Sequence, residues 1–209
     1  MKKRYFILIM IGVIITLGVV FSETIVLRLV GIRELEVFSQ KDYEESLVKL
    51  KEKYPERAQF LISTQEQFIS YSSLVEKDKQ YILTKPIQLL YFKEDSLVSI
   101  HSSCNVPINY WTWKLDWNID NRFEQFPPLS STSTLDIKLK QIQDVYGFRR
   151  ENTSENTLIV FWSRMMEKQV YGALETVIYN KRLSNKKEKL NTIFINVDHA
   201  FLGKIVLDE

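Results

Sequence analysis

The sequence predicts an α/β fold in which an apolar amino-terminal helix precedes a mixed α/β domain. Three observations predict this fold: a long uncharged run at the start of the chain, segments with helical periodicity, and two continuous apolar runs near the end. The chain has 209 residues, of which 45% are hydrophobic and 26% are charged, close to the average for globular proteins. This composition excludes a wholly disordered chain and a polytopic membrane bundle.

The start of the chain carries the strongest signal. Three basic residues precede residues 5–21, a run of 17 residues without a charge. As a helix this run would be about 25 Å long, a little under the ~30 Å hydrocarbon core of a bilayer. We therefore predict a transmembrane signal anchor at residues 1–22, with residues 5–21 in the lipid. A signal peptide cleaved after Ser22, which would give a secreted chain, and a buried soluble helix are the alternatives.

The basic residues Lys2, Lys3 and Arg4 predict the orientation of the anchor. Because a basic flank stays in the cytoplasm, the rest of the chain is expected on the extracytoplasmic side of the cell membrane. The net charge of the whole chain is only +2, which gives no electrostatic signature of nucleic-acid binding. The expected partners are the lipid bilayer, through residues 5–21, and an envelope protein or small ligand.

Residues 23–38 are predicted to form either a stalk or a first strand, and periodicity does not choose between them. Ser39 followed by Asp42 resembles a capping box and predicts the start of a helix. The apolar face of that helix is formed by residues at helical spacing, namely Tyr43, Leu47, Leu50 and Tyr54. A short strand at 58–62 and a second helix at 64–79 are expected next.

A β-hairpin is predicted from the β-rich segments 87–92 and 96–102. Residues 103–133 contain prolines and a Ser/Thr tract, so we expect a long irregular loop or linker there. Together these elements make residues 39–133 an α+β region.

The last region, residues 134–209, is predicted to end in a βαβ unit. A helix at 135–146 stops at a glycine. The continuous apolar runs at 157–162 and 192–197 are typical of strands covered on both faces, and the sequence between them favours a helix at 165–183.

Residues 156–163 and 191–198, with the helix between them, resemble the thioredoxin-like fold. They are most similar to membrane-anchored thiol-disulfide oxidoreductases of the bacterial envelope, in which a strand ending in Phe-Trp leads into a CxxC pair. In the family the CxxC pair lies four to seven residues beyond this tryptophan. Here, the positions four to seven residues beyond Trp162 hold Met166, Glu167, Lys168 and Gln169. Because disulfide exchange needs a thiolate, the resemblance implies the fold without that activity. The family's later cis-proline and its β-hairpin with a closing helix would fall beyond Glu209, which implies a degenerate or truncated module.

The single cysteine, Cys104, excludes an intrachain disulfide and a Cys-based zinc site. It lies three residues after His101, so a His-activated thiol or a mixed disulfide with a partner are functional interpretations. The structural interpretation is a small, partly buried residue after a strand. With only two histidines and no cluster of ligands, we expect no metal site and no cofactor.

An aromatic stretch inside the irregular region is the most unusual feature of the sequence. Its members are Tyr110, Trp111, Trp113, Trp117, Phe123 and Phe126. Asp116 and Asp120 interleave with these rings, and such a mixture can stack a sugar or bind a ligand cation. A pair of carboxyls could instead serve a glycosidase. The structural alternative is that the aromatic rings pin the loop onto the core.

These features favour a membrane-anchored, extracytoplasmic protein with a non-catalytic, thioredoxin-like binding or assembly role. Its predicted contact surface consists of Tyr110, Trp111, Trp113, Asp116, Trp117 and Asp120. The alternative is an envelope enzyme, either a thiol enzyme that uses Cys104 with His101 or a carboxylate hydrolase at the aromatic loop. The sequence contains no CxxC pair, no metal-ligand cluster and no nucleophile motif, which favours the non-catalytic role.

Overall fold

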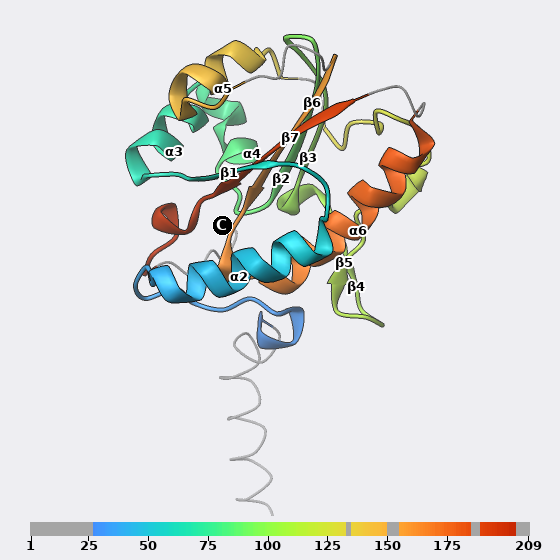
Figure 1. Ribbon diagram of the computed structural model, residues 1–209. Coiled ribbons are helices and arrows are strands. Elements are labelled where there is room, and N and C mark those ends of the chain that lie inside the picture. The colour runs from blue at the N-terminus through green and yellow to red at the C-terminus, as the bar shows by residue number, and fades with distance from the viewer. Residues whose placement is uncertain (1–26, 133–134, 150–154, 185–188, 204–209) are drawn as a thin grey trace, which may run out of the picture.

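The computed structural model describes residues 27–132, 135–149, 155–184 and 189–203 (Figure 1). Within these ranges, five strands form one mixed sheet in the order β1-β7-β6-β2-β3. The strands are β1 (Gln59–Ile62), β2 (Gln88–Lys93), β3 (Ser96–Ser102), β6 (Asn156–Trp162) and β7 (Leu190–Asn196). β1, β7 and β6 run parallel, whereas β2 runs antiparallel to both β6 and β3. The predicted α/β class is confirmed.

The two apolar strands predicted near the end of the chain are β6 and β7, and α6 (Glu167–Leu183) connects them. Every residue of β6 is buried, because this strand lies in the middle of the sheet with helices over both faces. Hairpin β2–β3 joins the same sheet through β2, with Leu90 opposite Ile159. The predicted regions 39–133 and 134–209 therefore share one sheet and one core.

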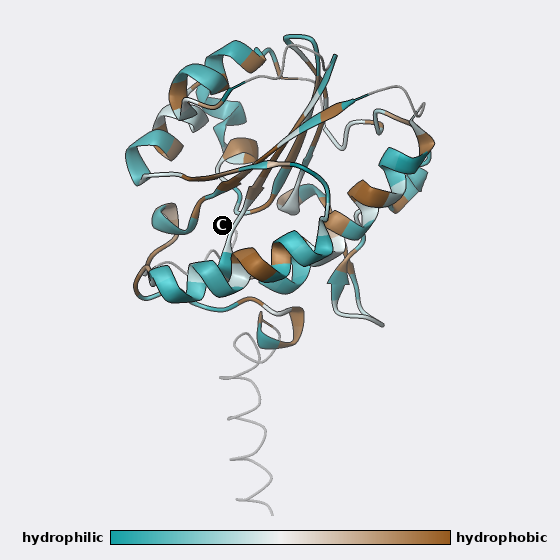
Figure 2. Cartoon of the chain, in the orientation of Figure 1, coloured by the Kyte–Doolittle hydropathy of each residue, from teal (hydrophilic) through white to brown (hydrophobic). Residues whose placement is uncertain are grey.

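Helices α2 (Gln40–Lys53) and α6 lie on one side of the sheet, and α3 (Gln65–Ser72), α4 (Gln80–Leu83) and α5 (Leu139–Tyr146) lie on the other (Figure 1). Neighbouring residues of β6 pack toward opposite layers, as the strand period requires. Phe161 stacks on Tyr71 of α3 with ring centroids 4.4 Å apart, and Trp162 stacks on Tyr43 of α2 at 5.9 Å. Figure 2 shows hydrophobic residues along the strands and hydrophilic residues on the outer helix surfaces.

The predicted helix at 64–79 starts as expected but ends early. The Thr64 side chain accepts a hydrogen bond from the Gln67 N–H, and the Gln67 side chain accepts one from the Thr64 N–H, which completes a capping box. The helix ends at Ser72, whose hydroxyl donates to the Ile69 carbonyl at 2.9 Å. Because such side-chain bonds compete with the helical ladder, the following residues form a 3-10 turn and the short α4 instead.

The helix predicted at 135–146 begins only at Leu139. The Leu139 N–H donates to the Asp95 carbonyl at 3.0 Å, and the Lys140 N–H donates to the Asp95 carboxylate at 2.8 Å. Asp95 in the β2–β3 turn therefore caps this helix from a distant part of the chain. The helix ends where predicted, at Tyr146, and is followed by Gly147, whose φ of +70° favours glycine.

The irregular region predicted at 103–133 contains a small hairpin that the sequence did not reveal. Its strands are β4 (Ile108–Asn109) and β5 (Lys114–Leu115), each too short for an alternating pattern. β5 contacts α6, so this region packs on the domain and is not a linker.

Residues 27–30 are helical, and this turn ends at Gly31, whose φ is +80°. They are therefore not part of the first strand that was one alternative for this segment. Leu35 then pairs with Leu202 in an isolated bridge. The predicted membrane span at 5–21 lies outside the residues that the structure describes. Among the residues that it does describe, no helix has the length and hydrophobicity needed to cross a bilayer.

Candidate functional site

The carboxyl ends of the parallel strands β6 and β7 form the edge at which open α/β sheets commonly bind ligands. After β6 the chain passes through Ser163 and a 3-10 turn, Arg164–Met166, into α6. After β7, Val197 leads directly to Asp198. This edge carries two features, a buried polar network and a pocket.

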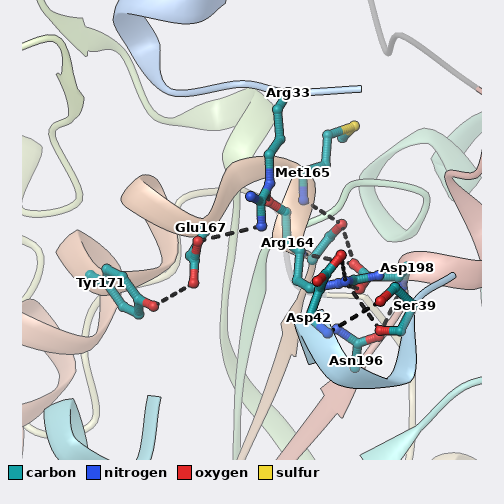
Figure 3. A network of polar contacts seen from close by, with 10 residues as sticks. Arg33, Ser39, Asp42, Arg164, Met165, Glu167, Tyr171, Asn196 and Asp198 are labelled. Carbon is teal, nitrogen blue, oxygen red and sulfur yellow. Dashed lines mark hydrogen bonds and ion pairs between the residues drawn. The ribbon is translucent and has the colours of Figure 1, made fainter. Parts of the chain in front are cut away.

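The polar network joins the ends of β6 and β7 to the start of α2 (Figure 3). Asp198 accepts hydrogen bonds from Ser163 Oγ at 2.7 Å, from Arg164 N at 2.8 Å and from Arg164 Nε at 2.5 Å. The Arg164 guanidinium also donates to the Ser39 carbonyl at 3.3 Å and lies 3.6 Å from the Asp42 carboxylate. Arg164 is 2% exposed and Asp198 is 0% exposed, so this ion pair holds three elements together and does not face a ligand.

A pocket of about 380 Å³ lies beside the 3-10 turn that follows β6. Its lining is mainly apolar and comes from segments that are far apart in the sequence, namely the residues before α2, the segment before β2, the loop after β3, hairpin β4–β5 and the turn itself. The lining includes Val30, Pro86, Val106, Met165 and Met166. Cys104 and Tyr110, both predicted as candidate residues, also line it. The volume lies within the ~300–1,000 Å³ range of small-molecule sites.

Met166 and Gln169, the two positions at which the resemblance would imply a redox pair, have different surroundings. Met166, at the first position, lines the pocket. Gln169, at the second, is fully buried, and its Nε2 donates to the carbonyl of Val30 and, at 3.0 Å, to that of Trp113. Its Oε1 accepts from Leu115 N at 2.7 Å. Gln169 therefore holds hairpin β4–β5 and the backbone of Val30 against α6 by hydrogen bonds. This role was not predicted from the sequence.

The sequence feature that could have indicated this role of Gln169 is its position on an apolar helix face. It shares the buried face of α6 with Val170, Ala173 and Val177. A polar side chain on such a face needs hydrogen-bond partners, because burying an unpaired polar group is costly. The sequence could thus indicate that Gln169 has partners, but it could not say which ones.

The predicted pair of His101 and Cys104 is not a hydrogen-bonded dyad. The Nε2 atom of His101 is hydrogen-bonded to Ser99 Oγ at 3.1 Å, and the buried ring packs on Phe123 with centroids 4.4 Å apart. Cys104 is half-buried, and its thiol donates to Ser102 Oγ at 3.5 Å. A His-activated thiol needs the base within hydrogen-bond reach of the sulfur, so this geometry does not support such an enzyme.

The buried histidine predicts a pH dependence of stability. Burial, and to a smaller degree the charge on Arg122, lowers the pKa of His101 to about 3. In the unfolded chain the pKa of histidine is about 6.5. Between these two values the unfolded chain binds one more proton than the folded chain, so stability is full above pH 6.5 and falls as the pH falls. From pH 7 to pH 5 this residue is expected to lower the free energy of unfolding by about 2 kcal/mol.

A His101→Gln variant tests this expectation, because glutamine does not titrate in this range. Denaturant unfolding of both proteins at pH 7 and pH 5 should show a smaller loss of stability in the variant. Equal losses in the two proteins would contradict the assignment to His101.

The predicted aromatic surface divides into a buried part and an exposed part. Trp117 and Phe123 are buried in the core, and Trp113 is half-buried. Tyr110 and Trp111, in the turn of hairpin β4–β5, are 74% and 95% exposed. The aromatic residues therefore do not form one stacking platform. Trp117 is unavailable to a ligand, and the exposed part is confined to the hairpin turn.

The carboxylates of this stretch lack the environment that a glycosidase needs. Asp116 and Asp120 are exposed, and Asp120 pairs with Arg122 at 2.9 Å. The hydrogen bond from Tyr179 to Glu124 lowers the pKa of Glu124. A general acid instead requires a carboxyl whose pKa is raised, so the geometry does not support the carboxylate hydrolase.

Comparison with protein-family models, with curated proteins and with solved structures finds no match to this chain. Within the described ranges, no group of three or more His, Cys, Asp or Glu side chains could hold a metal ion.

Proposed function

We propose that the chain is a membrane-anchored, extracytoplasmic protein whose thioredoxin-like domain has a non-catalytic binding or assembly role. One observation carries this proposal. An apolar pocket lies beside the turn that follows β6, and it is lined by Met166, the position at which the resemblance implies the first cysteine. Without a thiol pair the pocket has no exchange chemistry, but its volume and apolar lining suit an apolar side chain of an envelope protein.

The strand arrangement supports the thioredoxin-like part of the proposal. β6, α6 and β7 form the βαβ unit that carries the resemblance. In the family a β-hairpin follows this unit in the chain, whereas here hairpin β2–β3 precedes it and pairs with β6 in antiparallel direction. The hairpin beside the βαβ unit here is therefore an earlier segment of the chain.

A thiol enzyme is the second candidate function, because Cys104 lines the same pocket. It has weaker support than binding, since His101 is hydrogen-bonded to Ser99 and the Cys104 thiol to Ser102. The two candidates differ in whether Cys104 itself is required.

Photocrosslinking from Cys104 tests the binding role, because this is the only thiol of the chain. A benzophenone maleimide on Cys104 of the full chain, in native membranes, is expected to give a discrete crosslinked product. Met166→Trp should abolish the product by filling the pocket. The matched control is Ile69→Trp, which adds the same ring at an exposed position of α3 and should leave the product unchanged. A product that persists in Met166→Trp would contradict binding in the pocket.

Moving the thiol by one residue separates the two candidate functions. Ser103 also lines the pocket, so the double variant Cys104→Ser, Ser103→Cys keeps an attachment point there. A binding role predicts the same crosslinked product from this variant. A thiol enzyme predicts that Cys104→Ser alone abolishes its function.

A further inference from the structure

The turn of hairpin β4–β5 exposes two aromatic side chains at the end of the domain where the chain enters it. Trp111 is the most exposed large hydrophobic residue in the described part of the chain, and Tyr110, which also lines the pocket, lies beside it. The hairpin projects from the same end of the molecule as residues 27–30 (Figure 1). We infer that this turn inserts its two rings into the interface of the bilayer that residues 5–21 cross. The inference rests on the proposed membrane anchor.

Side-chain contacts fix the hairpin relative to the point where the chain enters the domain. The Nε2 atom of Gln169 donates to the carbonyls of both Val30 and Trp113, so those two carbonyls lie close together. The neighbouring Lys168 Nζ donates to the Leu29 carbonyl at 3.1 Å. The helical residues 27–30 and the hairpin are thus held together on the amino-terminal turn of α6.

The short distance to the predicted span places this end of the domain beside the membrane. The span ends at Phe21, and the described chain begins at Leu27. Six residue steps cover at most about 20 Å when fully extended. Because the headgroup regions extend roughly 5–8 Å beyond the hydrocarbon core on each side, residues 27–30 remain close to the lipid surface.

The turn holds Trp111 outward by its own hydrogen bonds. Asn109 Oδ1 accepts from the N–H of Trp111 at 3.0 Å and from that of Thr112 at 3.3 Å, and the Asn109 carbonyl accepts from Trp113 N at 2.8 Å. Packing in the core accounts for Trp117, but it does not account for a ring that is almost fully exposed. Tyrosine and tryptophan prefer the membrane interface because each combines an apolar ring with a polar group. Lipid contact would remove this exposed area from water.

Tryptophan fluorescence of the full chain in lipid vesicles tests the inference. The predicted span contains no tryptophan, so all emission comes from residues of the folded domain. The chain is reconstituted into phosphatidylcholine–phosphatidylglycerol vesicles with and without bromine on the acyl carbons near the headgroup. The difference between wild type and Trp111→Phe isolates Trp111, which is expected to emit at shorter wavelength and to lose most of its signal in brominated lipid. Trp113→Phe is the matched control, and the protein carrying it should keep the bromine-sensitive signal.

Flotation of the same vesicles separates the inference from the anchor on which it rests. A chain that floats with the vesicles, but whose Trp111 emission resembles that of tryptophan in water and ignores bromine, overturns the inference and leaves the anchor intact. A Trp111 that is shielded from water but insensitive to bromine also overturns it and points to a protein partner at the turn. A chain that does not float overturns both the anchor and the inference.

Discussion

Replacing Asp198 with asparagine is expected to destabilise the folded chain by about 3–5 kcal/mol, because it leaves a buried charge without its partner. Arg164 is 2% exposed, and its Nε lies 2.5 Å from the Asp198 carboxylate. Asp42 lies 3.6 Å from the same guanidinium, but its side chain is 61% exposed, so solvent screens its charge. Denaturant unfolding of the full chain in detergent, followed by tryptophan emission, measures the loss.

Two comparisons attribute that loss to the buried pair. Asp120→Asn makes the same chemical change in the exposed pair with Arg122, whose atoms lie 2.9 Å apart, and is expected to cost less than about 1 kcal/mol. The double variant Arg164→Met, Asp198→Asn removes both charges and should recover much of the stability lost in the single variant. Similar losses for Asp198→Asn and Asp120→Asn would show that burial of the pair does not matter.

Gln169→Leu is expected to destabilise the protein by roughly 2–4 kcal/mol, since each buried polar group left unsatisfied costs about 1–3 kcal/mol. Leucine fills a similar volume but offers no hydrogen bonds. The Leu115 N–H loses its acceptor, and the carbonyls of Val30 and Trp113 lose their common donor. Hairpin β4–β5 should then detach from α6 more readily than the sheet unfolds. Hydrogen exchange checks this directly, because the Leu115 amide should exchange faster than in the wild type.

The control for this variant is Glu175→Leu, which introduces the same side chain on the exposed face of α6. It removes only a surface ion pair with Lys53 at 4.0 Å, so its effect on stability is expected to stay below about 1 kcal/mol. If Leu115 keeps its wild-type exchange rate in Gln169→Leu, the side chain does not hold the hairpin in place.

Elements with local signals were predictable. The continuous apolar runs that became β6 and β7 needed only residue type and length, and the helix between them followed from the same pattern. Ser39 caps α2 as its sequence indicates, with its Oγ accepting from Asp42 N at 3.3 Å. The membrane span at 5–21 stays a prediction.

Elements that depend on distant contacts were not predictable. The start of α5 at Leu139 is set by Asp95, which lies in another turn of the fold. Hairpin β4–β5 has strands of two residues, which leave no periodic pattern, and it is held by Gln169 from α6. In both cases the deciding partner is far away in the sequence.

By itself, the sequence determined the uncharged start of the chain, the buried strands and the absence of a second thiol, because these depend on residue type and spacing along the chain. Only the tertiary structure decided that Cys104 and Met166 share a pocket and that His101 is bonded to Ser99. It also decided that Trp117 is buried while Trp111, six residues earlier, is exposed. The physical reason is that a side chain's surroundings depend on which distant elements pack against it, and the local pattern does not encode that packing.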